Sequence, residues 1–328
     1  MKVWDLHCDN LNELRRAEKA GSPKCFAHND LHIDLEKLQK GDYMLQCFAA
    51  FVNLADPAPG ADPLVTALEE VDVFKRIMAA YPDQIAPVYT AADIRKNAAA
   101  GKISGMLTIE EGGCCRGSLG VLRRMYELGV RMMTLTWNYE NELAAPQANP
   151  GGPLAAQTER GLTETGFAFV AEMERLHMIV DVSHLSDKGF WDIVEHGTRP
   201  FAASHSNCRA LAPHCRNLTD EMIRVMGERG GLVGLNYCSG FLDDQPSPEL
   251  CRSTVALMAK HAAHFKQVGG IGILGLGSDF DSIGGKLEMD DCSKLPLLAE
   301  ALRKEGFTED EVEAIFFRNA QRFFEENL

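Results

Sequence analysis

The chain carries little positive charge for its size. Its 328 residues include 33 Lys and Arg against 47 Asp and Glu, which gives a formal net charge of −14. Nucleic acids and anionic membranes attract basic surfaces, so neither is expected as a partner. The sequence also lacks an apolar run of about 18 residues, the length that a membrane-spanning helix needs.

Sorting signals and redox motifs are missing as well. No charged segment, apolar segment and small-residue cleavage site follow one another at the N-terminus, so we expect no signal peptide and a cytoplasmic location. The ten cysteines are scattered, and the adjacent Cys114 and Cys115 lie outside any C-x-x-C spacing. This pattern favours reduced core thiols over disulfides. A homodimer is compatible with these features, but the sequence does not decide the oligomeric state.

Eight short apolar, β-branched or glycine-rich runs are expected to form strands. Most are continuously apolar rather than alternating, which is typical of parallel strands buried on both faces. The runs cover residues 3–9, 43–53, 105–110, 131–137, 178–184, 201–205, 232–237 and 271–279.

Segments with helical periodicity separate nearly all of these runs. We expect helices over 34–40, 63–81, 119–128, 163–176, 186–196, 219–230, 248–268, 295–305 and 309–327. Strand–helix alternation repeated eight times predicts an α/β fold, a TIM-like (β/α)8 barrel, built as a single domain over 1–328. The alternative is an open doubly wound sheet. Such a sheet favours a G-x-G-x-x-G turn after its first strand, where this chain has His-Cys-Asp-Asn-Leu.

Potential metal ligands or titratable groups follow five of the eight expected strands. In a barrel of this type the C-terminal strand ends meet at one rim, where the chemistry lies. Taken singly, each such residue has an ordinary role as a helix cap, a turn residue or a buried polar pair. Together they fit a site for two metal ions about 3.5–4 Å apart. Nitrogen and oxygen ligands suit Zn²⁺, with Mn²⁺, Co²⁺ or Fe²⁺ as substitutes. The residues are His7, Asp9, Glu110, Glu111, His184, His205 and Asp279.

Seven motifs in order along the chain resemble the membrane dipeptidase (renal dipeptidase, peptidase M19) family. The resemblance covers essentially the whole chain, up to the closing Asn-Ala-Gln-Arg-Phe-Phe at 319–324. The motifs are Asp-Leu-His-Cys-Asp (5–9), Thr-Ile-Glu-Glu-Gly-Gly (108–113), Leu-Gly-Val-Leu-Arg with Leu-Gly-Val-Arg-Met-Met-Thr-Leu-Thr (119–136), Asp-Val-Ser-His (181–184), Ser-His-Ser (204–206), Arg-Asn-Leu-Thr-Asp (216–220) and Gly-Ser-Asp-Phe-Asp (277–281).

The resemblance implies a zinc-dependent dipeptidase with two Zn²⁺ ions and a metal-bridging hydroxide as nucleophile. One ion would be held by His7, Asp9 and a bridging glutamate, and the other by the same glutamate with His184 and His205. Glu110 is chosen as the bridge because it follows its strand directly, although the adjacent Glu111 leaves the choice open.

Three further roles follow from the same resemblance. Arg216 would bind the substrate carboxylate, for which a guanidinium fork is suited. Tyr237 would contact the substrate, and Asp279 would act as acid and base. The expected substrates are L-L dipeptides and dipeptides with a D-residue at the C-terminal position.

One position departs from the family pattern. Animal members have a histidine after Thr-Leu-Thr that contacts the scissile carbonyl, and this chain has Trp137 followed by Asn138. Because an indole does not titrate near neutral pH, oxyanion stabilisation would fall to zinc alone or to Asn138. Both residues are therefore candidates for substrate binding.

Two alternative functions stay open. Another binuclear-metal amidohydrolase would act on a different amide or ester, but such enzymes usually begin with His-x-His on the first strand and often use a lysine on the fourth. Here these strands end in His-x-Asp and Thr-Trp-Asn. A barrel that binds metal or peptide without turnover is the other alternative, and the full ligand set with Asp279 argues against it.

Overall fold

A computed structural model describes residues 1–56, 58, 61–147 and 159–328. Nine parallel strands form one sheet in the order β2-β1-β9-β8-β7-β6-β5-β4-β3, and an additional pairing of β2 with β4 closes eight of them into a barrel. The predicted (β/α)8 fold is therefore confirmed. The strands are β1 Val3–Asp5, β2 Tyr43–Phe51, β3 Ile85–Pro87, β4 Ile103–Glu110, β5 Val130–Thr134, β6 Ile179–Asp181, β7 Ala202–Ala203, β8 Leu232–Leu235 and β9 Leu274–Leu276.

One strand, β3, was not among the eight expected from the sequence. It pairs only with the first residues of β4, Ile103–Gly105, and β5 takes over the same edge from Leu107 onward. With three residues and a terminal proline, β3 is too short to give a recognisable pattern.

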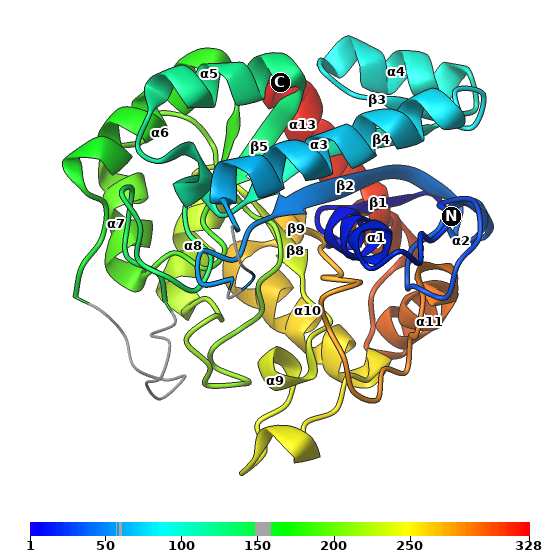
Figure 1. The fold of residues 1–328 in the computed structure, drawn as a ribbon. Coiled ribbons are helices and arrows are strands. Elements are labelled where there is room, and N and C mark those ends of the chain that lie inside the picture. The colour runs from blue at the N-terminus through cyan, green and yellow to red at the C-terminus, as the bar shows by residue number, and fades with distance from the viewer. Residues whose placement is uncertain (57, 59–60, 148–158) are drawn as a thin grey trace.

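Helices surround the barrel (Figure 1). They are α1 Asn10–Lys19, α2 Leu35–Lys40, α3 Pro63–Ala80, α4 Ala91–Ala99, α5 Leu119–Leu128, α6 Glu164–Leu176, α7 Asp187–His196, α8 Asp220–Glu228, α9 Ser239–Leu242, α10 Val255–Gly269, α11 Pro296–Lys304, α12 Glu309–Glu313 and α13 Asn319–Asn327. Each described helix is too short or too polar to cross a lipid bilayer.

Several helix predictions need correction. Helices α1, α4 and the four-residue α9 were not expected from the sequence. In α1, polar Asn10, Asn12 and Arg15 are buried beside two leucines, which hides its apolar period. The helix expected over 248–268 begins only at Val255, because the side chain of Thr254 accepts a hydrogen bond from Leu257 N–H and caps it there. The closing helix is interrupted by a π-helix over Ala314–Arg318.

The C-terminal helix closes one end of the barrel. Its Phe323 and Phe324 are fully buried in a cluster with the first residues of several strands, and Phe324 stacks on Trp4 of β1 with ring centroids 5.5 Å apart. Since these residues begin their strands, α13 covers the N-terminal end. The C-terminal end is left for the site.

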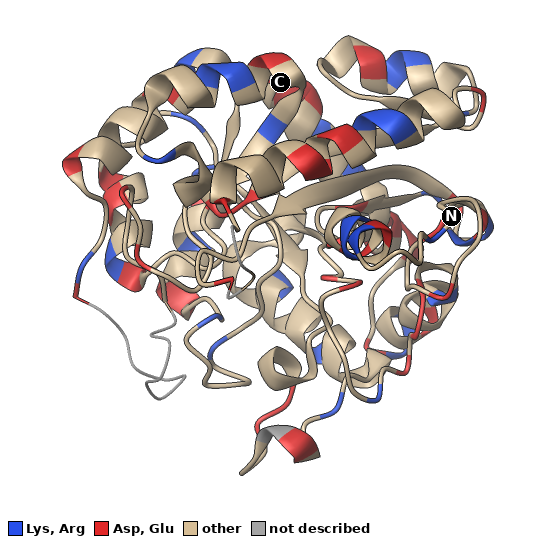
Figure 2. Cartoon of the chain, viewed as in Figure 1, with Lys and Arg blue, Asp and Glu red and all other residues tan. Residues whose placement is uncertain are grey.

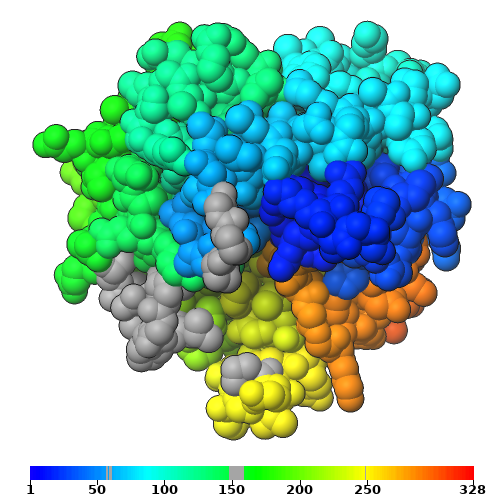
Figure 3. All heavy atoms as spheres, viewed as in Figure 1, coloured from blue at the N-terminus to red at the C-terminus, as the bar shows by residue number. Residues whose placement is uncertain are grey.

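The N-terminal and C-terminal parts of the chain lie side by side. In the sheet, β1 pairs with β9. In the space-filling view the blue N-terminal residues lie against the orange residues near the C-terminus (Figure 3). Acidic and basic residues both occur along α3 and the neighbouring helices in Figure 2.

Candidate metal centre

A cavity of about 440 Å³ opens at the C-terminal ends of the strands. Six residues singled out from the sequence line it, and they come from five separate strand ends: Asp9, Glu110, Trp137, Asn138, His184 and Asp279. The convergence follows from the barrel, because parallel strands bring their C-terminal ends to one rim.

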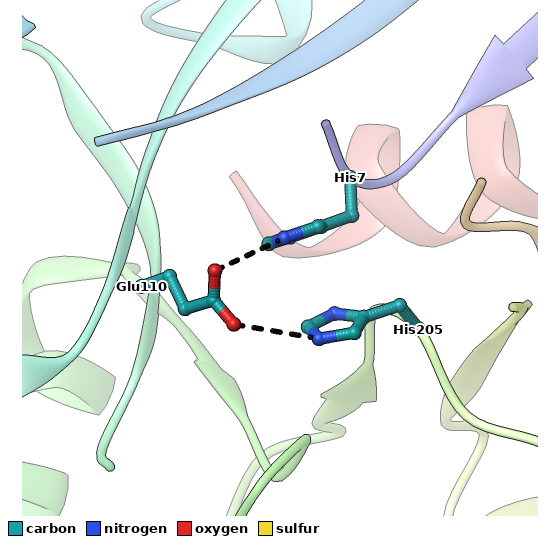
Figure 4. Close-up of side chains that lie close together, drawn as sticks. All are labelled: His7, Glu110 and His205. Atoms are coloured by element: carbon teal, nitrogen blue, oxygen red, sulfur yellow. Dashed lines mark ion pairs between the residues drawn. The ribbon is translucent and has the colours of Figure 1, made fainter. Parts of the chain in front are cut away.

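The carboxylate of Glu110, the last residue of β4, stands at the centre of the cluster. Its Oε2 lies 3.3 Å from Nε2 of His7, and its Oε1 lies 3.0 Å from Nε2 of His184 and 3.5 Å from Nε2 of His205. Figure 4 shows one oxygen directed at His7 and the other at His205, and the two imidazole rings stack with their centroids 3.9 Å apart. One carboxylate therefore faces two different histidine groups.

His7 and Asp9 follow β1 rather than belonging to it, because that strand ends at Asp5. The chain nevertheless stays extended: Cys8 bridges Phe280, Asp9 N–H donates to Phe280 O at 2.9 Å, and Ala49 N–H donates to Cys8 O at 3.0 Å. The expected convergence of the two side chains is found, with His7 Nε2 3.5 Å from Asp9 Oδ2.

Asp279 reaches the same cluster from the end of β9. Its Oδ1 lies 3.9 Å from His7 Nε2. Asn236 Nδ2 donates to its Oδ2 at 2.9 Å, and Ser282 Oγ donates to its Oδ1 at 2.6 Å. Both Asp279 and His184 adopt left-handed backbone conformations, with φ of 63° and 68°, which non-glycine residues rarely do. Such strain is characteristic of residues whose side chains the surrounding structure must aim.

Burial and neighbouring charges shift the pKa values of the carboxyl and imidazole groups in the cluster. Burial opposes charge on His7, yet the Glu110 and Asp9 carboxylates raise the pKa of His7 well above its usual range. Burial raises the pKa of Glu110, and nearby Asp9 adds to the rise. Burial, together with the charges of Arg216 and His7, lowers the pKa of His184 and of His205 well below the usual value. The cluster thus combines several buried carboxyl groups with two imidazoles whose neutral form is favoured.

The donor set fits divalent metal ions. Nε2 of His7 and both carboxylate oxygens of Asp9 are buried without a hydrogen-bond partner, which is costly unless another group satisfies them. Among the described residues, two groups place one ligand atom from each member within 4.8 Å of the others: His7 with Glu110 and His205, and His7 with Asp9 and Asp279. Neutral imidazoles and carboxylates are ligands that transition metals prefer.

Glu111 takes a separate position from Glu110. Its Oε1 accepts from Gly113 N–H at 2.8 Å, and its Oε2 accepts from Trp137 N–H at 2.8 Å. The side chain also caps the short helix over Gly112–Cys115. Burial raises the pKa of Glu111 to about 7. Its oxygens therefore serve the neighbouring backbone rather than the histidine cluster.

The other predicted substrate residues lie at different depths. Trp137 lines the cavity and packs edge-on against Phe51 at 4.9 Å, and the oxygen of Asn138 lies 2.9 Å from Nδ1 of His184. Arg216 is buried behind Phe241, with its guanidinium 5.4 Å from that ring. Tyr237 is also buried and packs against Phe280, outside the cavity lining.

Comparison with known proteins agrees with this site. The family model for membrane dipeptidase, peptidase family M19, matches residues 1–327. The chain belongs to the membrane dipeptidase family. Family membership makes it a metallo-dipeptidase, a hydrolase with a metal cofactor. The resemblance predicted from the seven motifs is confirmed.

Relatives in this family match over most of their length. An uncharacterized dipeptidase of Schizosaccharomyces pombe is 32% identical over 98% of this chain and 79% of its own. The crystal structure of a dipeptidase of family M19 aligns with a TM-score of 0.89 at 28% identity, covering 100% of this chain and 98% of the other. A Rhodobacter sphaeroides metallopeptidase, liganded with a phosphinate mimic of L-Ala-D-Ala, aligns with a TM-score of 0.88 at 27% identity over 100% and 99% of the two chains.

Sequence reasoning missed the polar residues that support the ligands. Ser204 Oγ lies 2.7 Å from Nδ1 of His205 and also contacts the buried Asp181. Asn236 holds Asp279. Asp181 and Ser204 lie within the motifs Asp-Val-Ser-His and Ser-His-Ser. A histidine that binds a metal through one ring nitrogen needs a hydrogen-bond partner on the other, and this requirement was the available signal.

Proposed function

We propose that this dipeptidase uses two zinc ions held by His7, Asp9, Glu110, His184 and His205. The orientation of Glu110 carries the proposal, since one of its oxygens faces His7 and the other faces His184 and His205. This is the arrangement that a carboxylate bridging two ions requires. Mn²⁺, Co²⁺ or Fe²⁺ would suit the same nitrogen and oxygen donors.

Two ions in this position would supply a Lewis acid for the scissile carbonyl and a water with a pKa near neutrality. The chain's own contribution is to fix the ligands and to exclude bulk water from them. His7 and Asp9 would hold one ion and His184 and His205 the other, and the side chains of all four are buried. Glu110 joins the two halves.

Asp279 is proposed to move the proton from the attacking water to the leaving amine. It lines the cavity, is 8% exposed, and is aimed by Asn236 and Ser282. A carboxylate held within reach of both the nucleophile and the leaving group is suited to act first as base and then as acid.

Arg216 is proposed to bind the substrate carboxylate. Its Nε is buried without a hydrogen-bond partner, while one of its terminal nitrogens donates to His205 O at 3.1 Å. The guanidinium lies 5.4 Å from the ring of Phe241, which lines the cavity, so the buried cation lies directly behind the cavity wall. A role for Tyr237 in substrate binding stays a prediction.

The proposed substrates are L-L dipeptides and dipeptides with a C-terminal D-residue. The ligand of the Rhodobacter sphaeroides relative, a mimic of L-Ala-D-Ala, supports including the second class. Trp137 and Phe51 add an apolar wall beside His184, suited to an uncharged side chain.

A panel of L-L and L-D dipeptides, with an N-acetylated dipeptide amide and a simple ester as controls, tests the proposal. We expect hydrolysis of dipeptides, loss of activity after dialysis against a chelator, and recovery on adding zinc. Turnover of the ester or blocked amide in preference to every dipeptide would instead favour an amidohydrolase of other specificity. Full activity in metal-free protein would contradict the metal centre.

A further inference from the structure

His184 and His205 both turn the same nitrogen towards the centre of the cluster. Their Nε2 atoms lie 3.0 Å from each other, and 3.0 Å and 3.5 Å from Oε1 of Glu110. An imidazole that binds a metal through Nε2 carries its proton on Nδ1. That N–H needs an acceptor when it is buried, and the acceptor fixes both the tautomer and the orientation of the ring.

The two histidines find their acceptors in different ways. Nδ1 of His205 lies against Oγ of Ser204, the preceding residue at the end of the same strand, and Ser204 in turn contacts Asp181 of β6. Nδ1 of His184 lies 2.9 Å from Oδ1 of Asn138, which comes from the loop after β5. His184 therefore depends on a residue outside its own strand, in a loop that must itself be held.

Glu111 holds that loop. Its carboxylate accepts from the backbone N–H of Trp137, immediately before Asn138, and contacts the side-chain amide of Asn141. The amide of Asn141 also donates to Leu135 O at 2.8 Å, which ties together the two ends of the segment 135–141. All of these contacts fix the position from which Asn138 reaches His184.

We propose that Asn138 is a positioning residue for His184, accepting its Nδ1–H, and that Glu111 acts through Asn138 by anchoring the loop. The inference rests on the proposed metal centre. It is compatible with the expectation that Asn138 stabilises the oxyanion, because the amide oxygen faces the histidine while the amide nitrogen stays a hydrogen-bond donor. It also gives the adjacent glutamates separate tasks: Glu110 faces the metals, and Glu111 secures the partner of one metal ligand.

Two substitutions at Asn138 separate the amide oxygen from the rest of the side chain. Asn138→Leu removes the acceptor at similar size, and Asn138→Asp keeps an acceptor oxygen in place. Asn53→Leu is the matched control, because Asn53 lines the same cavity and its side-chain oxygen accepts from Ala55 N–H instead. Zinc affinity is measured by competition with a chromophoric chelator, and folding by circular dichroism.

We expect Asn138→Leu to weaken binding of one of the two zinc ions about 10- to 100-fold, while Asn138→Asp and Asn53→Leu stay within about threefold of the unmodified protein. Unchanged zinc affinity in Asn138→Leu would overturn the inference. So would an equal loss in Asn138→Asp, because the acceptor is retained there.

A second measurement does not depend on how the variants fold. Long-range ¹H–¹⁵N spectra of the zinc-loaded, unmodified protein report which nitrogen of each histidine carries a proton. A protonated Nδ1 on His184 is expected, and a deprotonated Nδ1 would overturn the inference. If the unmodified protein bound no zinc, the proposed function itself would fail and this inference with it. If the unmodified protein bound two zinc ions and Asn138→Leu bound them equally tightly, this inference would fail while the proposed function would stand.

Discussion

At the scale of single residues, the site depends on how a few buried polar atoms are aimed. Glu110 and Glu111 are chemically identical neighbours, yet one faces three histidines and the other accepts from backbone N–H groups. The two side chains point in different directions because successive side chains alternate along a strand, and this strand ends at Glu110. Glu111 then turns away with a left-handed φ of 95°.

Asp279 gives a prediction at the same scale. Asp279→Asn keeps the size and much of the hydrogen bonding of the side chain but removes its capacity to carry a proton. We expect kcat for dipeptides to fall about 10²- to 10⁴-fold while metal content is retained. Steady-state kinetics with metal analysis of the same sample check this.

The exposed Asp290→Asn is the control and should leave kcat unchanged. If Asp279→Asn lost its metals together with its activity, Asp279 would be a ligand rather than the proton carrier. Asp279 belongs to one of the two candidate ligand groups. Measuring metal content and activity on the same sample therefore distinguishes a metal ligand from a proton carrier.

The sequence predicted which side chains converge, but not the polar residues that support them. His7, Asp9, Glu110, His184 and His205 lie at or just beyond the C-terminal ends of apolar strands, and the barrel alone brings such positions together. The role of Asn138 depends on the path of the loop after β5, which no local pattern encodes. The depth of Tyr237 depends in the same way on how Phe280 packs against it.

At the scale of elements, the ends of β7, β8 and β9 meet with almost no space between their backbones. A Cβ on Gly277 would lie 1.8 Å from Ser204 O, and one on Gly234 would lie 1.9 Å from the same oxygen. Ser204 precedes the ligand His205, so the two glycines permit the close approach that places this histidine.

Gly277→Ala is expected to push the end of β7 outward. Overpacking of this kind costs about 1–3 kcal/mol or more in the free energy of unfolding. Zinc affinity should fall as well, because His205 moves with Ser204. Denaturant unfolding and chelator competition measure the two effects.

Gly275→Ala provides the comparison within the same strand. Its added Cβ would meet its nearest neighbour at 3.5 Å, an ordinary contact, so little change in stability is expected. Equal tolerance of both substitutions would show that the strand ends are less tightly packed than the structure indicates.

Element prediction succeeded where apolar periodicity was strong. The helix expected over 119–128 matches α5 Leu119–Leu128, where Ser118 accepts from Val121 N–H and Gly129 ends the helix with a φ of 114°. By contrast, α1 buries an ion pair, with Arg15 Nε 2.9 Å from Glu70 Oε1. Burial of paired polar groups obscured its period.

At the scale of the whole molecule, the barrel separates stability from chemistry. The C-terminal helix α13 packs its aromatic rings into the N-terminal end of the barrel, and the candidate metal ligands lie at the C-terminal end. Strand–helix alternation was sufficient to predict this architecture. The single domain over 1–328, the homodimer and the cytoplasmic location stay predictions.

If Glu110 bridges two metal ions, the number of ions bound per chain depends on its carboxylate. Elemental analysis of the unmodified protein, Glu110→Gln and Glu111→Gln, equilibrated at one free zinc concentration, compares the neighbouring glutamates directly. At a free zinc concentration high enough to saturate a site that the altered loop has weakened, we predict about two zinc ions per chain in the unmodified protein and in Glu111→Gln. We predict about one or none in Glu110→Gln, which should also lose dipeptidase activity. Two retained ions and full activity in Glu110→Gln would contradict a metal centre bridged by Glu110.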